Sequence, residues 1–163
     1  MTEKVTRSVL VADMADFTRT VLESGVEAAL GKIATMREAA TLSLPTHGGR
    51  IEKLYADNVL AVFSSPEEAV RGAMCFNRAL QGEVQVCVGI GHGELVRWAV
   101  DGDYYGLELN LASKLGEDTA RPGEILLTHA AAGLLSAETR ARCHGLTLGV
   151  AGTSVLYFRF DWM

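Results

Sequence analysis

Apolar and polar positions along this chain follow two different periods, which predict both strands and helices. Residues 8–12 form a short apolar run typical of a buried strand, and residues 51–55 and 59–63 predict the two strands of a hairpin. Residues 22–44 instead carry apolar side chains at helical spacing. They predict one long amphipathic helix that ends before Pro45.

The second half of the chain continues this mixture. Ser65-Pro66-Glu67-Glu68 is a helix-start signal, with a capping hydroxyl, a proline in the first turn and acids near the positive end of the helix dipole. Further expected elements are a helix to about residue 80, a strand at 84–90, a helix after the turn at 101–106, and a hairpin at 146–160. Strand, helix, two strands, helix and strand in this order predict an α+β fold, with a ferredoxin-like βαββαβ core and extra C-terminal strands.

Composition narrows the class of protein. A chain of 163 residues with 48% hydrophobic residues is long enough to bury its own core, so we expect a single domain over residues 1–163. The net charge of −5 argues against nucleic-acid binding, which needs clustered Lys and Arg. No stretch approaches the roughly 20 apolar residues of a membrane span, and the N-terminus lacks a signal peptide's apolar core. We therefore expect a cytoplasmic protein without a membrane partner.

Cysteine spacing agrees with a reducing compartment. Cys75, Cys87 and Cys143 are scattered and lack metal-ligand spacing, so they are interpreted as free or buried thiols.

Two acids stand at places where the predicted strands end. Asp13 follows the apolar run at 8–12, and Asp57 lies at the tip of the predicted hairpin. One interpretation is local, because Asp and Thr at a helix start, here Asp13, Asp16 and Thr18, satisfy free N–H groups, and Asp suits tight turns. The other is a site for a hard divalent cation such as Mg²⁺ or Mn²⁺, which prefers carboxylate, carbonyl and phosphate oxygens.

Three motifs in order carry a family resemblance. D-M-x-D-F-T follows the first strand, K-x-x-x-D spans the hairpin from Lys53 to Asp57, and D-x-x-G-x-x-x-N-x-x-x-K runs from Asp103 to Lys114. Together they resemble the class III nucleotidyl (adenylate/guanylate) cyclase catalytic domain, from about Arg7 to about Thr128. The C-terminal part resembles it less closely.

The resemblance implies an adenylate cyclase that converts ATP into 3′,5′-cyclic AMP and pyrophosphate. It implies two Mg²⁺ or Mn²⁺ ions per site, held by Asp13, Asp57 and the Met14 carbonyl. Phe17 and Thr18, with the neighbouring backbone N–H groups, would hold the outer phosphates.

The resemblance also assigns roles to the residues that contact the nucleoside. Lys53 and Asp103 would read adenine, Asn110 would orient the ribose, and Lys114 would stabilise charge on the α-phosphate. In the family these groups and the metal acids come from different subunits. A chain carrying both sets implies a head-to-tail homodimer with two equivalent sites.

The sequence departs from the family pattern at four points. Lys114 replaces the usual Arg, Asp16 and Ala56 replace glycines, and no Lys follows Lys114. Lysine keeps the charge but loses the planar fork of arginine, which predicts a slow or regulated enzyme. Two alternatives stay open. One is a degenerate cyclase-like module that binds nucleotide, or pairs with a partner cyclase, without turnover; the other is an unrelated ferredoxin-like interaction domain.

Overall fold

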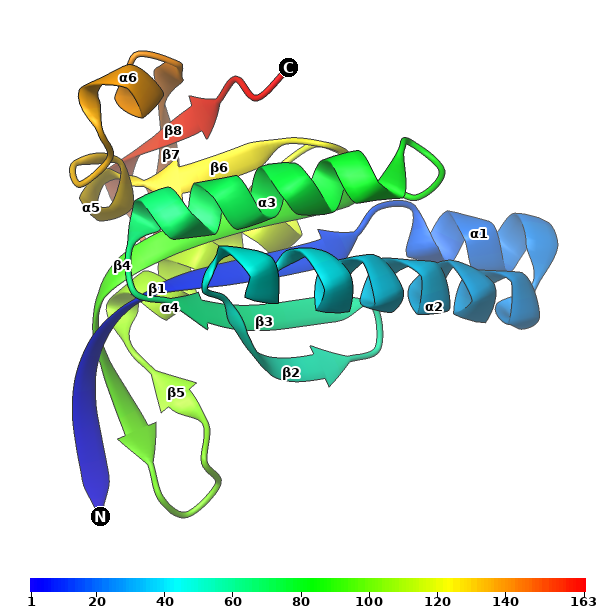
Figure 1. Ribbon diagram of the computed structural model, residues 1–163, viewed down its shortest axis with the longest axis horizontal. Helices are drawn as coiled ribbons and strands as arrows, with labels where there is room; N and C mark the ends of the chain where they lie inside the picture. Colours follow the sequence, from blue (N-terminus) through cyan, green and yellow to red (C-terminus); the bar gives the residue numbers. More distant parts are fainter.

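One mixed β-sheet runs through the computed structural model, which describes residues 1–163 (Figure 1). The elements follow in the order β1 (Thr2–Met14), α1 (Phe17–Ser24), α2 (Val26–Ser43), η1 (Pro45–His47), β2 (Arg50–Tyr55), β3 (Asn58–Phe63), α3 (Pro66–Leu80), β4 (Val86–Trp98), β5 (Tyr104–Tyr105), α4 (Leu107–Ser113), η2 (Lys114–Thr119), β6 (Ile125–Thr128), α5 (His129–Ala132), α6 (Ala137–Arg140), β7 (Cys143–Val150) and β8 (Thr153–Phe160).

The strand order confirms the predicted fold class. Along the sheet the strands are arranged β2-β3-β1-β4-β6-β8-β7, and β5 pairs with β4 off this path. β1 is antiparallel to both β3 and β4, and β2 is antiparallel to β3, which is the pairing of a ferredoxin-like βαββαβ core. β6, β8 and β7 then extend the sheet beyond β4.

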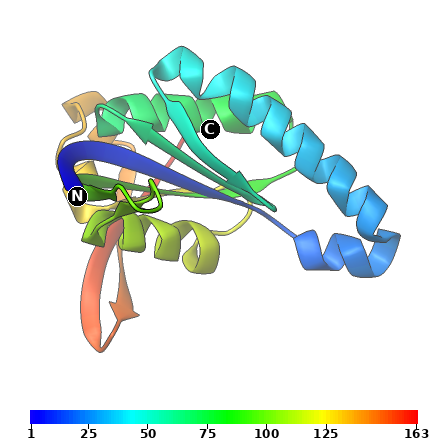
Figure 2. The same cartoon turned by 90° about the horizontal axis from the view of Figure 1, so that it is seen from below.

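Helices cover the two faces of the sheet unequally. α2 and α3 lie along one face, and α4 lies on the other (Figure 2). The core cluster on the α2–α3 side contains 26 buried residues, whereas the cluster that includes Ala112 of α4 contains 6. Because most of the apolar burial lies on the first face, we expect most of the stability to come from that side.

The long helix expected over residues 22–44 is wrong in one respect. The chain forms two helices, α1 and α2, that meet at Gly25. Gly25 has a φ of 90°, a conformation that glycine adopts without the steric cost of a Cβ, and its N–H donates to the Val21 carbonyl at 2.9 Å. The break reverses the direction of the chain, so that α1 lies beside one end of α2 and begins next to the end of β1 (Figure 1).

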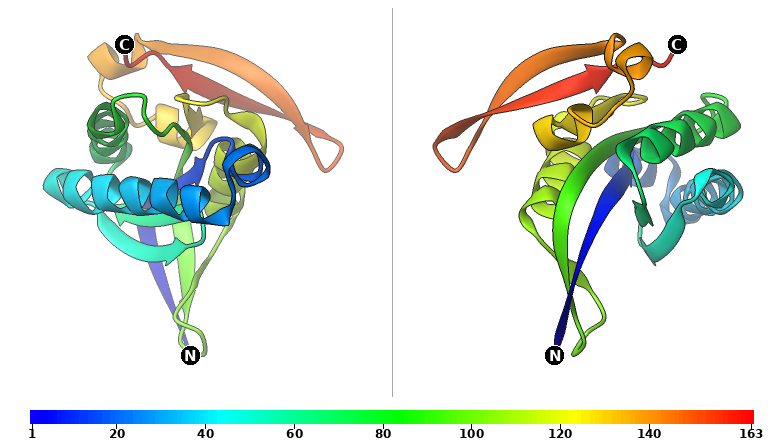
Figure 3. Two further views of the ribbon diagram at one scale, coloured as in Figure 1. Left: turned by 90° about the vertical axis from the view of Figure 1, so that its right-hand side faces the viewer. Right: turned by 60° about the vertical axis from the view of Figure 1, so that its left-hand side comes forward.

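Two groups of strands project from the body of the molecule. The N-terminal half of β1 and the distal half of β4 with β5 form one arm, and β7 and β8 form another (Figure 3). None of the helices combines the length and apolar character that crossing a lipid bilayer requires. All three cysteines are free thiols, as expected.

Candidate active site

The two acids that the sequence singles out meet at one end of β1. Asp13 is the penultimate residue of β1 and pairs across the ladder with Asn58, the first residue of β3. Asp57 precedes Asn58 in the hairpin turn, and the Met14 N–H donates to the Asp57 carbonyl at 2.9 Å. Residues far apart in the sequence are thereby fixed side by side by backbone hydrogen bonds.

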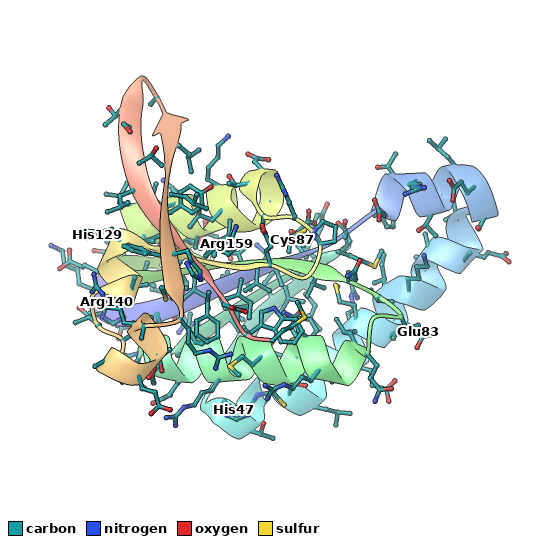
Figure 4. All side chains as sticks on the ribbon, turned by 90° about the horizontal axis from the view of Figure 1, so that it is seen from above. His47, Glu83, Cys87, His129, Arg140 and Arg159 are labelled. Carbon is teal, nitrogen blue, oxygen red and sulfur yellow. The ribbon has the colours of Figure 1, made fainter.

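Electrostatics around this pair are strongly negative. Burial raises the pKa of Asp13 to about 7, and the charge of Asp57 and a side-chain hydrogen bond with it add to the rise. The nearby Glu117 and Asp118 raise this pKa further. Cys87, labelled in Figure 4, lies opposite Asp13 in the β1–β4 ladder, and burial with the Asp13 charge raises the pKa of its thiol to about 11. The negative charge around Asp13 and Asp57 therefore favours the binding of a cation.

The donor set fits a hard divalent cation only in part. Two half-buried carboxylates suit Mg²⁺ or Mn²⁺. No group of three or more His, Cys, Asp and Glu side chains gathers as a complete metal site. The remaining ligands would have to be the Met14 carbonyl, water and oxygens of a phosphate-bearing ligand, which is how Mg²⁺ is often held.

The local interpretation of these acids finds little support. Asp16 occupies the N-cap position of α1, with a φ of 60°, but its side chain makes no capping hydrogen bond. The Asp57 carboxylate accepts a hydrogen bond from the Asn58 side chain at 3.3 Å and contacts Asp13, but it bonds to no backbone N–H of its turn. Asp13 lies inside β1 rather than at a helix start. The carboxylates are therefore free to bind a ligand.

Phe17 and Thr18 are the first two residues of α1, close to the end of β1 in the chain. Phe17 packs against the main core, while Thr18 is exposed. The N–H groups of a first helical turn have no partner within the helix, and no acid lies in the first turn of α1 to occupy them. This end of the helix can therefore accept an anion.

A cleft of about 560 Å³ lies on the α4 side of the sheet. Its lining includes Lys53 of β2, Asp103 before β5 and Asn110 of α4, with Asn58 and Glu117 toward the carboxylates. The Lys53 ammonium lies 3.2 and 3.3 Å from the two Asp103 oxygens. A hollow of about 640 Å³ between the end of α3 and the C-terminal tail contains none of the residues that the motifs single out. The structure thus gathers the expected nucleoside contacts in one cleft.

Glycines on β4 allow α4 to lie close to the sheet. A methyl group at Gly89 would collide with the Ala112 carbonyl, and one at Gly91 would collide with the Glu108 carbonyl. Glu108 then fixes the helix, because its carboxylate accepts hydrogen bonds from the His92 N–H at 3.0 Å and from the Thr128 hydroxyl. Asn110, two residues farther along α4, is thereby held at the cleft.

Lys114 is placed differently from the other expected contacts. It lies at the junction of α4 and η2, and its ammonium pairs with Asp118 at 3.1 Å. It does not line the cleft, whereas Glu117 of η2 does. η2 is a π-helix, a local irregularity that is frequent at functional sites.

Three residues near the site escaped the sequence analysis. Glu117 and Asp118 add negative charge beside Asp13, and Arg37 of α2 donates to the Ala56 carbonyl at 2.8 Å. The i,i+4 spacing of Lys114 and Asp118 was a readable signal for their ion pair. No sequence signal indicates the contact of Arg37, because it joins a helix to a hairpin.

Solved structures with similar folds include several nucleotide cyclases. An adenylate/guanylate cyclase/hydrolase from Silicibacter pomeroyi superposes with a TM-score of 0.83 and 23% identity over 98% of each chain. The catalytic core of a rhodopsin-guanylyl cyclase with converted specificity, in complex with ATPalphaS, has a TM-score of 0.83 and 14% identity over 99% of this chain and 98% of that one.

Curated relatives are similar over part of the chain. An uncharacterized protein of Mycobacterium tuberculosis is 36% identical over 126 residues, which are 75% of this chain and 32% of the relative. The match spans about a third of the length of that relative. No family model matches the chain. The structural similarity supports the resemblance that the motifs indicate, and the chain has the fold of the adenylate and guanylate cyclase catalytic domains.

Proposed function

We propose that this chain is an adenylate cyclase that converts ATP into 3′,5′-cyclic AMP and pyrophosphate. The observation that carries the proposal is that one chain holds Asp13 beside Asp57 and also gathers Lys53, Asp103 and Asn110 in a cleft. Carboxylates suited to a divalent cation and polar groups suited to a nucleoside therefore occupy one face of a cyclase-like fold.

Adenine is recognised by Lys53 and Asp103. The carboxylate accepts a hydrogen bond from the exocyclic amine, and the ammonium donates to a ring nitrogen. In the free protein these side chains pair with each other, with 53% and 45% of their surfaces exposed. An exposed ion pair contributes only about 0–1 kcal/mol, so a base can displace it at little cost.

The phosphates lie toward Asp13, Asp57 and the start of α1. Asp13, Asp57 and the Met14 carbonyl would hold two Mg²⁺ or Mn²⁺ ions, which neutralise phosphate charge and lower the pKa of the ribose 3′-hydroxyl. Asn110 orients the ribose, and Phe17 and Thr18 hold the outer phosphates through backbone N–H groups. The 3′-oxygen then bonds to the α-phosphorus, the bond to pyrophosphate breaks, and the hydroxyl proton passes to solvent.

Two copies of the chain complete the site in this proposal. In a head-to-tail homodimer, the carboxylates of one copy face the Lys53, Asp103 and Asn110 of the other, which gives two equivalent sites. Exposed apolar side chains include Tyr55, which lines the cleft, with 71% of its surface exposed, and Leu107 at the start of α4, with 70%. A second copy would cover such side chains.

The alternative is a module that binds nucleotide without turnover. It is favoured by the engagement of Lys114 with Asp118 and by the absence of any lysine after residue 114.

Lys114→Arg tests whether weak stabilisation of the α-phosphate limits the rate. Arginine offers a planar fork that binds two phosphate oxygens, so we expect kcat to rise roughly tenfold while KM changes little. Steady-state kinetics of cyclic AMP formation provides the measurement. A lower kcat would show that the site is built around lysine.

Product identification tests the proposed function itself. Purified chain is incubated with ATP or GTP at millimolar Mn²⁺ and again at millimolar Mg²⁺, and the products are identified by mass spectrometry. We expect cyclic AMP from ATP, and none from the Asp57→Asn variant. ATP binding without product would favour the module without turnover.

A further inference from the structure

Arg37 reaches from α2 to the turn that carries Asp57. Its Nη2 donates to the Ala56 carbonyl at 2.8 Å in a solvent-exposed contact, and the residue as a whole is partly buried. Its Nε is buried without a hydrogen-bond partner, and no carboxylate lies within ion-pair distance. The one hydrogen bond that holds the guanidinium therefore goes to the turn that carries Asp57.

The turn that Arg37 contacts has an unfavourable backbone conformation. Ala56 has a φ of 49°, in the left-handed region where the Cβ of an L-residue is crowded. Arg37 holds the Ala56 carbonyl, and the Met14 N–H holds the Asp57 carbonyl at 2.9 Å. The residue pair Ala56-Asp57 is therefore fixed from two sides, and the direction of the Asp57 side chain is fixed with it.

We propose that Arg37 is a positioning residue that locks the Ala56-Asp57 turn and so holds the Asp57 carboxylate beside Asp13 for a divalent cation. The inference rests on the proposed function, because it assumes that the carboxylate pair binds the cation. The inference predicts the direction in which cation affinity changes when Arg37 is removed. The positive charge of Arg37 by itself repels a cation, so removing the side chain would tighten binding if charge alone mattered and weakens it if position matters.

Direct Mn²⁺ binding to the nucleotide-free protein tests the inference, with free Mn²⁺ followed by electron paramagnetic resonance. Loss of a group that orients a metal ligand typically weakens affinity tenfold or more, so we expect Arg37→Met to raise the Kd for Mn²⁺ roughly tenfold. Arg7→Met, which removes an exposed arginine earlier in β1, is the matched control for loss of charge and leaves the Kd unchanged. Arg37→Lys keeps the charge and one donor, and it gives a smaller loss.

A second substitution separates positioning of the turn from other effects. Glycine adopts a left-handed φ without steric cost, so Ala56→Gly reduces the need for the brace. We expect the double variant Arg37→Met/Ala56→Gly to recover part of the lost Mn²⁺ affinity. In metal-free protein, hydrogen exchange at the Asp57 and Asn58 amides rises in Arg37→Met and falls again in the double variant.

The outcomes distinguish this inference from the proposed function. If wild type binds Mn²⁺ and Arg37→Met binds it equally or more tightly, the positioning role is wrong and the proposed function is untouched. The same holds for Arg37→Lys if Arg37→Met fails to fold. If wild type binds no Mn²⁺ without nucleotide, or Asp57→Asn binds it as tightly as wild type, this inference fails, whereas the proposed function fails only if wild type forms no cyclic AMP.

Discussion

Asp13→Asn is expected to stabilise the metal-free protein and at the same time to abolish cyclic AMP formation. The pKa of Asp13 is raised to about 7, chiefly by burial and then by Asp57, so the ionised carboxylate is unfavourable in the folded state. Asparagine keeps the shape and removes the charge. A residue retained for function rather than stability shows this combination.

The pH dependence follows from the same shift. Between the unfolded value of 3.8 and the folded value of about 7, the folded state binds more protons than the unfolded state, so the free energy of unfolding falls as pH rises. Asp13 is partly exposed, so solvent screens its charge and the effect on the free energy of unfolding is smaller than the full pKa shift implies. We expect Asp13→Asn to gain about 1–2 kcal/mol at pH 8 and nothing below pH 4.

Thermal unfolding in EDTA at pH 5 and pH 8 measures this effect. Wild type should be less stable at the higher pH, and Asp13→Asn should show a smaller difference. Added Mn²⁺ should stabilise wild type and not the variant. Asp16→Asn, which removes an exposed carboxylate from the neighbouring helix start, is the control that retains the wild-type pH dependence. A destabilised Asp13→Asn protein would instead assign Asp13 a structural role.

Exchanging the adenine contacts is expected to change nucleotide selectivity by a large factor. In Lys53→Glu/Asp103→Cys, the carboxylate that accepts from the adenine amine and the ammonium that donates to the ring are both lost. Because a site built to hydrogen-bond a substrate discriminates strongly against an analogue, we expect the ATP preference in kcat/KM to fall roughly 100-fold. The exposed Lys53–Asp103 pair contributes little to stability, so the variant stays folded.

Competition between ATP and GTP in one reaction measures that ratio directly. Both products are quantified at equal nucleotide concentrations, with thermal unfolding as the folding control. Unchanged selectivity for ATP would remove Lys53 and Asp103 from base recognition.

The fold could be predicted from the sequence because apolar residues recur at clear strand or helix spacing in the core strands and in α3. The hairpin around Ala56 and Asp57 forms as expected, and Ser65 caps α3 by accepting from the Glu68 N–H. The break at Gly25 was not predicted, because apolar spacing continues across it from one helix to the next. The spacing of apolar residues indicates which face of a helix is buried, but it does not indicate whether one helix continues or two helices meet.

The site was predictable where motif residues lie on strands and turns. The register of β1 with β3 brings Asp13 to the hairpin. Lys53 and Asp103, taken from two separate motifs, also meet as an ion pair. The position of Lys114 was not predictable, because it depends on the π-helical turn that follows α4 and on pairing with Asp118. The contact between Arg37 and Ala56 likewise depends on how α2 packs against the hairpin.

Mixing two inactive variants tests the central claim most directly. Asp57→Asn lacks a carboxylate of the metal pair, and Asn110→Ala lacks the ribose contact, so each alone should produce no cyclic AMP. If the two sets of residues meet across a homodimer, an equal mixture contains mixed dimers with one intact site, and about a quarter of the wild-type activity should return. An active wild type whose two variants fail to complement each other would contradict the shared site, and an inactive wild type would contradict the enzyme itself.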